Sequence, residues 1–169
     1  MIIGVDLGRC AGICVGIDTP ELEQVDLPQD LGAMMTRFEG AMRRVIRANS
    51  PTLLSWERPF LNFTRMDAQG MLRTERLYGQ AATMAKLASE YGVASINDQP
   101  KTVRKKIVGS GAADADTIMR FCQAQGVMPQ SDHCADAYVM WLFGKAHLNA
   151  ASRSGRNSAP RRSRGKGGV

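Results

Sequence analysis

The order of strand-like and helix-like segments is the feature of this chain that most restricts its fold. Short apolar runs bounded by turn residues predict strands, and apolar residues that recur every three to four positions predict helices. Three strands come first, and helices and strands alternate after them. This order predicts an α/β domain in which helices pack on a sheet. We expect strands at Met1–Asp6, Ile13–Asp18, Leu22–Leu27, Leu53–Glu57 and Val93–Asn97, and helices at Leu31–Ala48, Met71–Tyr91, Pro100–Val108, Ala115–Gln125 and Asp132–His147.

By composition the chain divides into a globular part and a basic tail. Its 169 residues suffice for one domain, and 44% of them are hydrophobic, as in ordinary globular proteins. From Leu148 onward every charged residue is basic and apolar side chains are rare, which is typical of disorder. We therefore predict a folded domain over residues 1–147 and a basic, disordered tail over residues 148–169.

The net charge of +6 resides in that tail, so the body is formally neutral. Positive charge on a flexible segment would help such a body to approach a polyanion. No apolar run approaches the ~20 residues of a membrane span, and the first residues enter a strand directly instead of forming a signal peptide. These features predict a cytoplasmic, nucleoid-associated protein.

The cysteines indicate neither a zinc site nor disulfides. Cys10, Cys14, Cys122 and Cys134 lack paired C-x-x-C spacing. We expect all of them to be reduced residues of the core.

Four acidic or imidazole side chains occupy positions where folding could bring them together. Asp6 ends the first apolar strand, with a turn at Gly8, and Glu57 ends the fourth strand. The two carboxylates meet only if these strands are neighbours in one sheet. His133 and Asp136 are three positions apart at the start of the last helix, so they lie on one face of its first turn.

Such a group of side chains predicts the chemistry of a nuclease. Mg²⁺ prefers oxygen ligands and needs few carboxylates from the protein. Two ions roughly 3.5–4 Å apart can clamp the attacking water and the leaving oxygen of a phosphodiester. We therefore expect two Mg²⁺ ions per active site, replaceable by Mn²⁺, with Asp6 shared between them. The predicted ligands and catalytic residues are Asp6, Glu57, His133 and Asp136.

With these motifs the chain resembles the RuvC-type Holliday junction resolvases of the ribonuclease H-like superfamily. The resemblance covers roughly residues 1–146 and rests on Asp-x-Gly at Asp6, the strand-end Glu57, VRKKIVGSGAAD from Val103 to Asp114, and His-x-x-Asp-Ala from His133 to Ala137. It implies a ribonuclease H-like nuclease domain with a mixed five-stranded sheet, antiparallel first and parallel later, and helices on both faces. It also implies a homodimer in which each subunit nicks one strand of a four-way DNA junction. It also implies that the helix after the fourth strand forms the dimer interface.

The loop after Glu57 carries candidate DNA contacts. Phe60 lies three residues beyond Glu57, and Arg58, Phe63 and Arg65 share its loop. Exposed aromatic rings beside basic residues can stack on unpaired bases, worth ~1–3 kcal/mol each. In the resolvases an aromatic residue at this offset inserts at the junction centre. We expect DNA stacking for Phe60, whereas Phe63 fits stacking and core packing equally.

A basic run opens the helix expected at Pro100–Val108. Arg104 stands where the resolvase motif carries a lysine that contacts the substrate phosphate, and Lys105 and Lys106 follow it. A second family lysine falls on Ala115 and is missing here. The phosphate contact is therefore assigned to Arg104, Lys105 or Lys106, and the strength of catalysis is left open.

The sequence leaves several further points open. Asp132 is an alternative ligand, because it also precedes Asp136 on the same helical face. His133 fits a metal ligand or a general base equally well. Two other functions remain as alternatives, namely a related nuclease that acts on structured RNA and a catalytically weak junction-binding protein.

Overall fold

The computed structural model describes residues 1–60 and 67–157 of the chain. It contains one five-stranded sheet in the order β3-β2-β1-β4-β5, which confirms the predicted α/β class. The strands are β1 (Ile2–Asp6), β2 (Cys10–Gly16), β3 (Glu21–Asp26), β4 (Leu53–Glu57) and β5 (Ala94–Asp98). The helices are α1 (Leu31–Asn49), α2 (Ala68–Glu90), α3 (Pro100–Ile107), α4 (Ala115–Ala124) and α5 (Asp132–Asn157).

The sheet is mixed, as the resemblance implies. β2 pairs antiparallel with both β1 and β3, whereas β1 pairs parallel with β4 and β4 pairs parallel with β5. Because parallel strands end at the same edge, the last residues of β1, β4 and β5 lie side by side there. In this register Val5 is opposite Trp56, and Glu57 is opposite Asp98.

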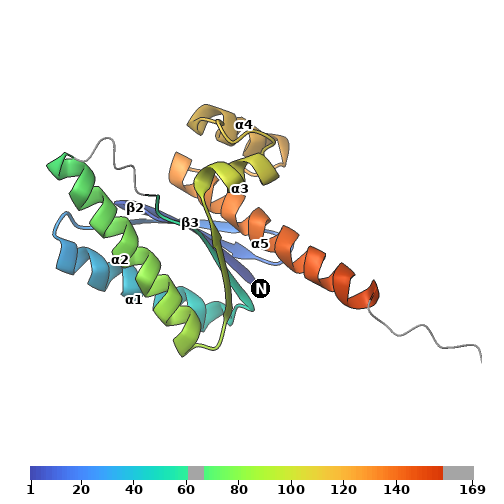
Figure 1. Ribbon diagram of the computed structural model, residues 1–169, viewed down its shortest axis with the longest axis horizontal. Coiled ribbons are helices and arrows are strands. Elements are labelled where there is room, and N and C mark those ends of the chain that lie inside the picture. Colours follow the sequence, from blue (N-terminus) through green and yellow to red (C-terminus); the bar gives the residue numbers. More distant parts are fainter. Residues whose placement is uncertain (61–66, 158–169) are drawn as a thin grey trace, which may run out of the picture.

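Helices cover both faces of the sheet (Figure 1). On one face α1 and α2 bury Met34, Phe38, Met84 and Leu87 against β1 and β4. On the other face α5 packs on β1 and β2, and α3 and α4 pack on α5. The molecule is thus a three-layer α/β/α domain with a core on each side of the sheet.

Helix α1 ends at its C-cap Ser50, which adopts a left-handed conformation with φ 43°. The backbone N–H of Ser50 donates a hydrogen bond to the Ile46 carbonyl oxygen.

Helix α5 is longer than predicted. The expectation that the last helix ends at His147 is wrong, because α5 continues to Asn157. The segment from Ala146 to Ser152 contains neither Gly nor Pro, and Leu148 still packs against the core on this side of the sheet. The first part of the predicted tail is therefore helical, and residues 158–169 lie outside the described residues.

The cysteine prediction holds with one exception. All four thiols are free, and Cys14, Cys122 and Cys134 are buried. Cys10, the first residue of β2, is only half-buried.

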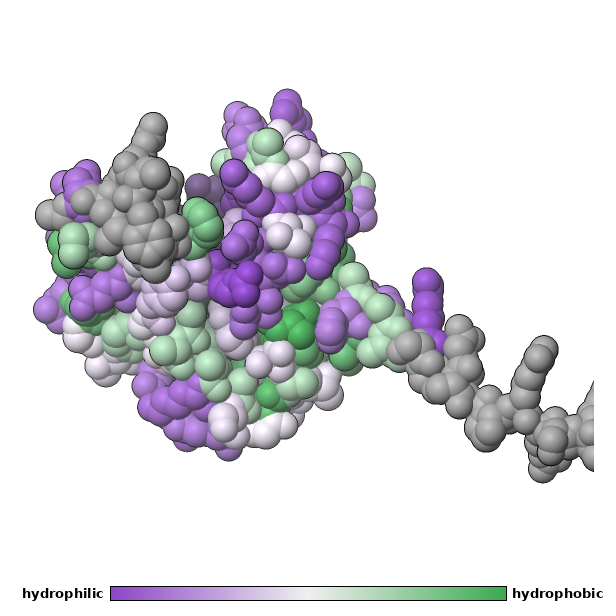
Figure 2. All heavy atoms as spheres, viewed as in Figure 1, coloured by the Kyte–Doolittle hydropathy of each residue, from purple (hydrophilic) through white to green (hydrophobic). Residues whose placement is uncertain are grey.

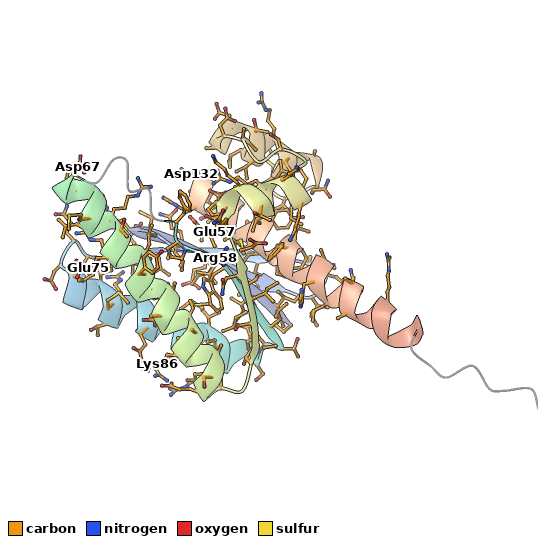
Figure 3. The ribbon with its side chains drawn as sticks, viewed as in Figure 1. Glu57, Arg58, Asp67, Glu75, Lys86 and Asp132 are labelled. Carbon is orange, nitrogen blue, oxygen red and sulfur yellow. The ribbon has the colours of Figure 1, made fainter. Side chains whose placement is uncertain are left out.

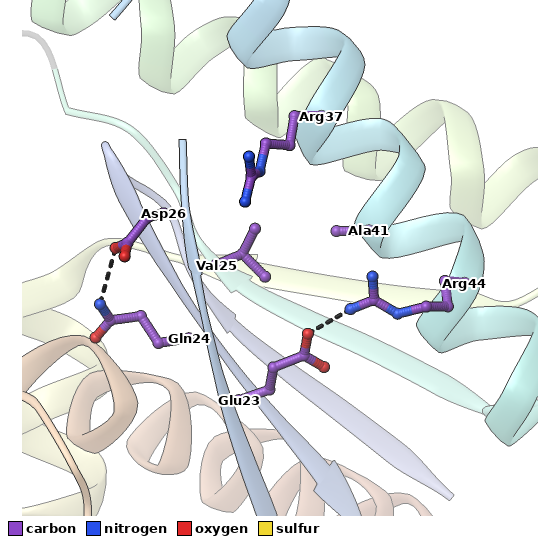
Figure 4. Close-up of a pocket in the computed structure, with 7 residues that line it drawn as sticks. All are labelled: Glu23, Gln24, Val25, Asp26, Arg37, Ala41 and Arg44. Atoms are coloured by element: carbon purple, nitrogen blue, oxygen red, sulfur yellow. Dashed lines mark hydrogen bonds and ion pairs between the residues drawn. The ribbon is translucent and has the colours of Figure 1, made fainter. Parts of the chain in front are cut away.

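A shallow pocket lies between β3 and α1, and none of its lining residues is a predicted site residue (Figure 4). Polar side chains of its lining bind one another, since Arg44 forms an ion pair with Glu23 and the Gln24 amide donates to Asp26 at 2.9 Å.

None of the described helices is long and apolar enough to cross a membrane.

Candidate active site

Two of the predicted site residues meet because β1 and β4 are adjacent parallel strands. Asp6 and Glu57 each follow the Val5–Trp56 pair by one residue. Asp6 is 8% exposed, and Glu57 is half-buried. Figure 3 shows Glu57 and Arg58 where β4 leaves the sheet, between α2 and α3. Figure 2 shows hydrophilic side chains at the same place in the middle of this face.

The first turn of α5 brings His133 onto Asp6. The His133 Nδ1 atom lies 2.9 Å from Asp6 Oδ2, a hydrogen bond whose donor depends on the imidazole tautomer. Asp136, one turn further along α5, is close enough to both Asp6 and Glu57 for its charge to raise the pKa of each carboxyl. The structure therefore gathers all four predicted side chains at one edge of the sheet.

Two strand glycines let α5 approach the sheet this closely. A Cβ atom at Gly12 would lie 2.0 Å from the His133 carbonyl oxygen, and one at Gly4 would lie 2.3 Å from the Trp141 backbone nitrogen. The helix backbone thus rests directly on the strands. Sequence reasoning missed both residues, although a glycine inside an apolar strand is a known sign of close backbone approach.

The Asp136 carboxylate has a cationic partner on α3. Arg104 Nη2 lies 3.3 Å from Asp136 Oδ1 and 3.4 Å from Oδ2. Arg104 Nη1 donates to the Ala113 carbonyl oxygen at 3.3 Å. Of the three basic residues predicted to contact DNA from this helix, Arg104 is the one that reaches the acidic cluster.

Burial dominates the electrostatics of the carboxyls. Burial raises the pKa of Glu57 to about 8, with further upward contributions from the charges of Asp6 and Asp136. Burial raises the pKa of Asp6 to about 6, although the His133 hydrogen bond opposes the rise. The pKa of Asp136 is raised by burial against the charge of Arg104. The pKa of His133 is raised chiefly by its hydrogen bond to Asp6.

The donor set suits a hard divalent cation. Three carboxyls whose ionisation is opposed by burial would be stabilised as anions by a bound cation, and carboxylate oxygen is the ligand that Mg²⁺ prefers. No described residue donates a hydrogen bond to Glu57. As the side chains stand, no three Asp, Glu, His or Cys residues of the described chain are placed to hold one ion, and Asp6 and Asp136 instead contact His133 and Arg104.

The alternative ligand Asp132 lies outside this cluster. Its side chain is 57% exposed, and its Oδ1 atom lies 3.9 Å from His133 Nε2. It accepts a hydrogen bond from the His133 backbone N–H at 3.0 Å. Of the two candidates at the start of α5, the structure brings His133 and not Asp132 to Asp6.

The predicted DNA contacts fall into three groups. Phe60 is 62% exposed, and Arg58, the residue directly after Glu57, is also exposed. Lys105 is exposed, and Lys106 forms an ion pair with Asp98 at 3.3 Å. Phe63 and Arg65 lie outside the described residues.

Asp98 is a strand-end acid that sequence reasoning missed. It ends β5 opposite Glu57 and also accepts a hydrogen bond from the Gln99 backbone N–H at 2.8 Å. Its position directly after the predicted strand Val93–Asn97 was the signal that could have revealed it.

Comparison with known proteins identifies a relative of this chain by sequence. No family model matches the chain. A crossover junction endodeoxyribonuclease RuvC from Parvibaculum lavamentivorans is 27% identical over 154 residues, which cover 89% of this chain and 81% of the relative.

Solved structures share the fold. Thermus thermophilus RuvC matches with a TM-score of 0.66 at 18% identity over 89% of this chain and 96% of the other. The same protein in complex with a Holliday junction substrate matches with a TM-score of 0.68 at 18% identity over 88% and 95%. A yeast mitochondrial Holliday junction resolvase matches with a TM-score of 0.56 at 12% identity over 94% and 84%. Sequence and fold together thus confirm the resemblance of this chain to the RuvC-type resolvases of the ribonuclease H-like superfamily.

Proposed function

We propose that this protein is a divalent-metal-dependent endodeoxyribonuclease that resolves four-way DNA junctions by paired nicks. The observation that carries the proposal is a group of three carboxyls at one sheet edge of a RuvC-like fold, namely the buried Asp6 and the half-buried Glu57 and Asp136. Their mutual charge repulsion makes the site a strong attractor for cations.

Each ligand has a distinct role in the proposal. Asp6 and Glu57 would hold one Mg²⁺ ion, and Asp6 with Asp136 and His133 would hold the other. Two such ions would supply Lewis acidity and an activated water for in-line phosphodiester hydrolysis. Through its 2.9 Å contact with Asp6, His133 also fixes the orientation of that carboxylate.

The basic and aromatic groups around the cluster bind the DNA. Arg104 is assigned to a substrate phosphate, because its side chain is part-exposed beside the carboxylates. Phe60 is assigned to the junction centre, where an exposed ring can stack on an unpaired base. Arg58, Lys105 and Lys106 add positive charge along the DNA path.

Two nicks on opposite strands require two active sites, so the proposal includes a homodimer. Helix α2 supports this part, because it exposes three large apolar side chains on the side away from the sheet. Met71, Leu72 and Tyr78 are 55%, 52% and 43% exposed. Exposed apolar side chains gathered on one helix are typical of a protein–protein interface.

A nicking assay tests the function. Radiolabelled four-way, three-way and linear duplex DNA are incubated with the full chain in Mg²⁺ or in EDTA. We expect symmetric nicks in the four-way junction in Mg²⁺ and none in EDTA. Asp6→Asn should abolish nicking but retain junction binding, whereas Asp26→Asn, an exposed acid at the end of β3, should nick normally. Equal cleavage of all three DNAs, or normal cleavage by Asp6→Asn, would overturn the proposal.

A further inference from the structure

The positively charged side chain of Arg104 lies beside the carboxylates of the candidate active site, where a bound cation would also lie. Its guanidinium contacts both oxygens of Asp136, at 3.3 and 3.4 Å. Its charge also opposes the rise in the pKa of Asp6 and of Glu57. One side chain therefore compensates part of the negative charge of all three acids.

The contacts of Arg104 with Asp136 are not those of a tight arginine–carboxylate pair. Charge-assisted N–O distances are usually about 2.7–2.9 Å, and the strongest pairs use two guanidinium nitrogens side by side. Here a single nitrogen serves both oxygens at longer distances. The Arg104 Nε atom is buried without a hydrogen-bond partner among the described residues. The ion pair between Arg104 and Asp136 is therefore one that another cation can replace at Asp136.

We infer that Arg104 competes with a divalent metal ion for Asp136, so that the ion on the His133–Asp136 side of the site binds only after the guanidinium has moved away. The inference rests on the proposed function in one respect, the assignment of Asp136 as a metal ligand. Two effects act together, since the guanidinium occupies the carboxylate oxygens and its positive charge repels a second cation. The affinity of the site for metal is consequently lower than its acids alone would give.

The side chain has room to make this movement. Arg104 is 26% exposed and Asp136 is 17% exposed, so solvent reaches both partners. The backbone of α3 need not shift, because the guanidinium is held at its far end by Asp136 and the Ala113 carbonyl oxygen.

Binding of Mn²⁺ to the full chain without DNA tests the competition. The electron paramagnetic resonance signal of free Mn²⁺ gives the dissociation constant at pH 8. We expect Arg104→Gln to bind Mn²⁺ roughly three- to tenfold more tightly than the wild type, the range of a part-exposed ion pair. Arg104→Lys retains the charge and should stay near the wild type.

Lys106→Gln is the matched control. Lys106 lies on the same helix and is 3.3 Å from its partner, the same distance as in the Arg104–Asp136 pair, but that partner is Asp98. Its affinity for Mn²⁺ should change less than twofold. Arg104→Met serves as a second variant if thermal unfolding shows that Arg104→Gln is not folded.

Affinity for Mn²⁺ that is unchanged or weaker in the folded, uncharged Arg104 variants would overturn the inference. Equal tightening by Lys106→Gln would also overturn it, because the effect would then be one of general charge. A different result would show that only the proposed function is wrong. In that case Arg104→Gln would bind Mn²⁺ more tightly than the wild type, but the wild type would nick no junction.

Discussion

Replacing Gly12 with alanine should disrupt the active site from a position that carries no functional group. The new Cβ would lie 2.0 Å from the His133 carbonyl oxygen and 2.5 Å from its carbonyl carbon. Real Cβ atoms essentially never come within 3.0 Å of such neighbours, so the start of α5 must retreat by roughly 1 Å. Both clashing atoms belong to the helix backbone, which cannot rotate away as a side chain would.

A retreat of this size opens the contact between His133 and Asp6. The 2.9 Å distance would grow beyond the ~3.2 Å limit of an ordinary hydrogen bond. Overpacking in a close-packed core costs roughly 1–3 kcal/mol of the free energy of unfolding. Misplacement of a catalytic group by about 1 Å can cost on the order of 100-fold in rate. We therefore expect a protein that still folds but nicks the junction on the order of 100-fold more slowly.

Two measurements check this prediction, urea unfolding and single-turnover nicking of a four-way junction at saturating enzyme. Gly40→Ala is the matched control, because its Cβ would meet nothing within 4 Å on helix α1. That variant should gain about 0.5–1 kcal/mol of stability, since alanine is the better helix former, and keep its nicking rate. A Gly12→Ala protein with wild-type stability and a wild-type rate would refute the argument that close packing positions His133.

Three further predictions concern single site residues. His133→Ala should reduce the single-turnover nicking rate far more than Asp132→Ala, because only His133 contacts Asp6; equal losses would show that Asp132 takes part. Phe60→Ala should leave the melting temperature unchanged, since the ring is 62% exposed, and should weaken cleavage of branched DNA; a melting temperature lowered by several degrees would instead place Phe60 in the core. The pKa of Glu57 rises from 4.5 in the unfolded chain to about 8 in the folded protein, so between these pH values the folded protein holds a proton that the unfolded chain has released. Without metal, the contribution of Glu57 to the free energy of unfolding should therefore be complete below pH 4.5 and lost as the pH rises to about 8. Urea unfolding in EDTA at pH 5.5 and pH 8 measures this loss of stability, which should be smaller in Glu57→Gln than in the wild type. The same pH dependence in the wild type and in Glu57→Gln would contradict the conclusion that burial raises the pKa of Glu57.

Much of the fold followed from local sequence patterns. The apolar runs and helical repeats located every described strand and helix, with each boundary except the end of α5 within a few residues, because period and turn residues act over short distances. The strand-end positions of Asp6 and Glu57 and the three-residue spacing of His133 and Asp136 were also visible without a structure. The end of α5 was missed, because the helix at Leu148 is stabilised by packing against the core and not by neighbouring residues in the sequence.

The sequence by itself therefore determined which side chains are available for the site and which of them share a local element. Only the tertiary structure decided that β1 and β4 are adjacent, that Gly12 lets α5 touch the sheet, and that Arg104 faces Asp136. Each of these facts joins segments that are distant in the chain. Such contacts depend on packing and strand pairing, which no local period encodes, and so the partner of each active-site carboxylate could be identified only in the folded protein.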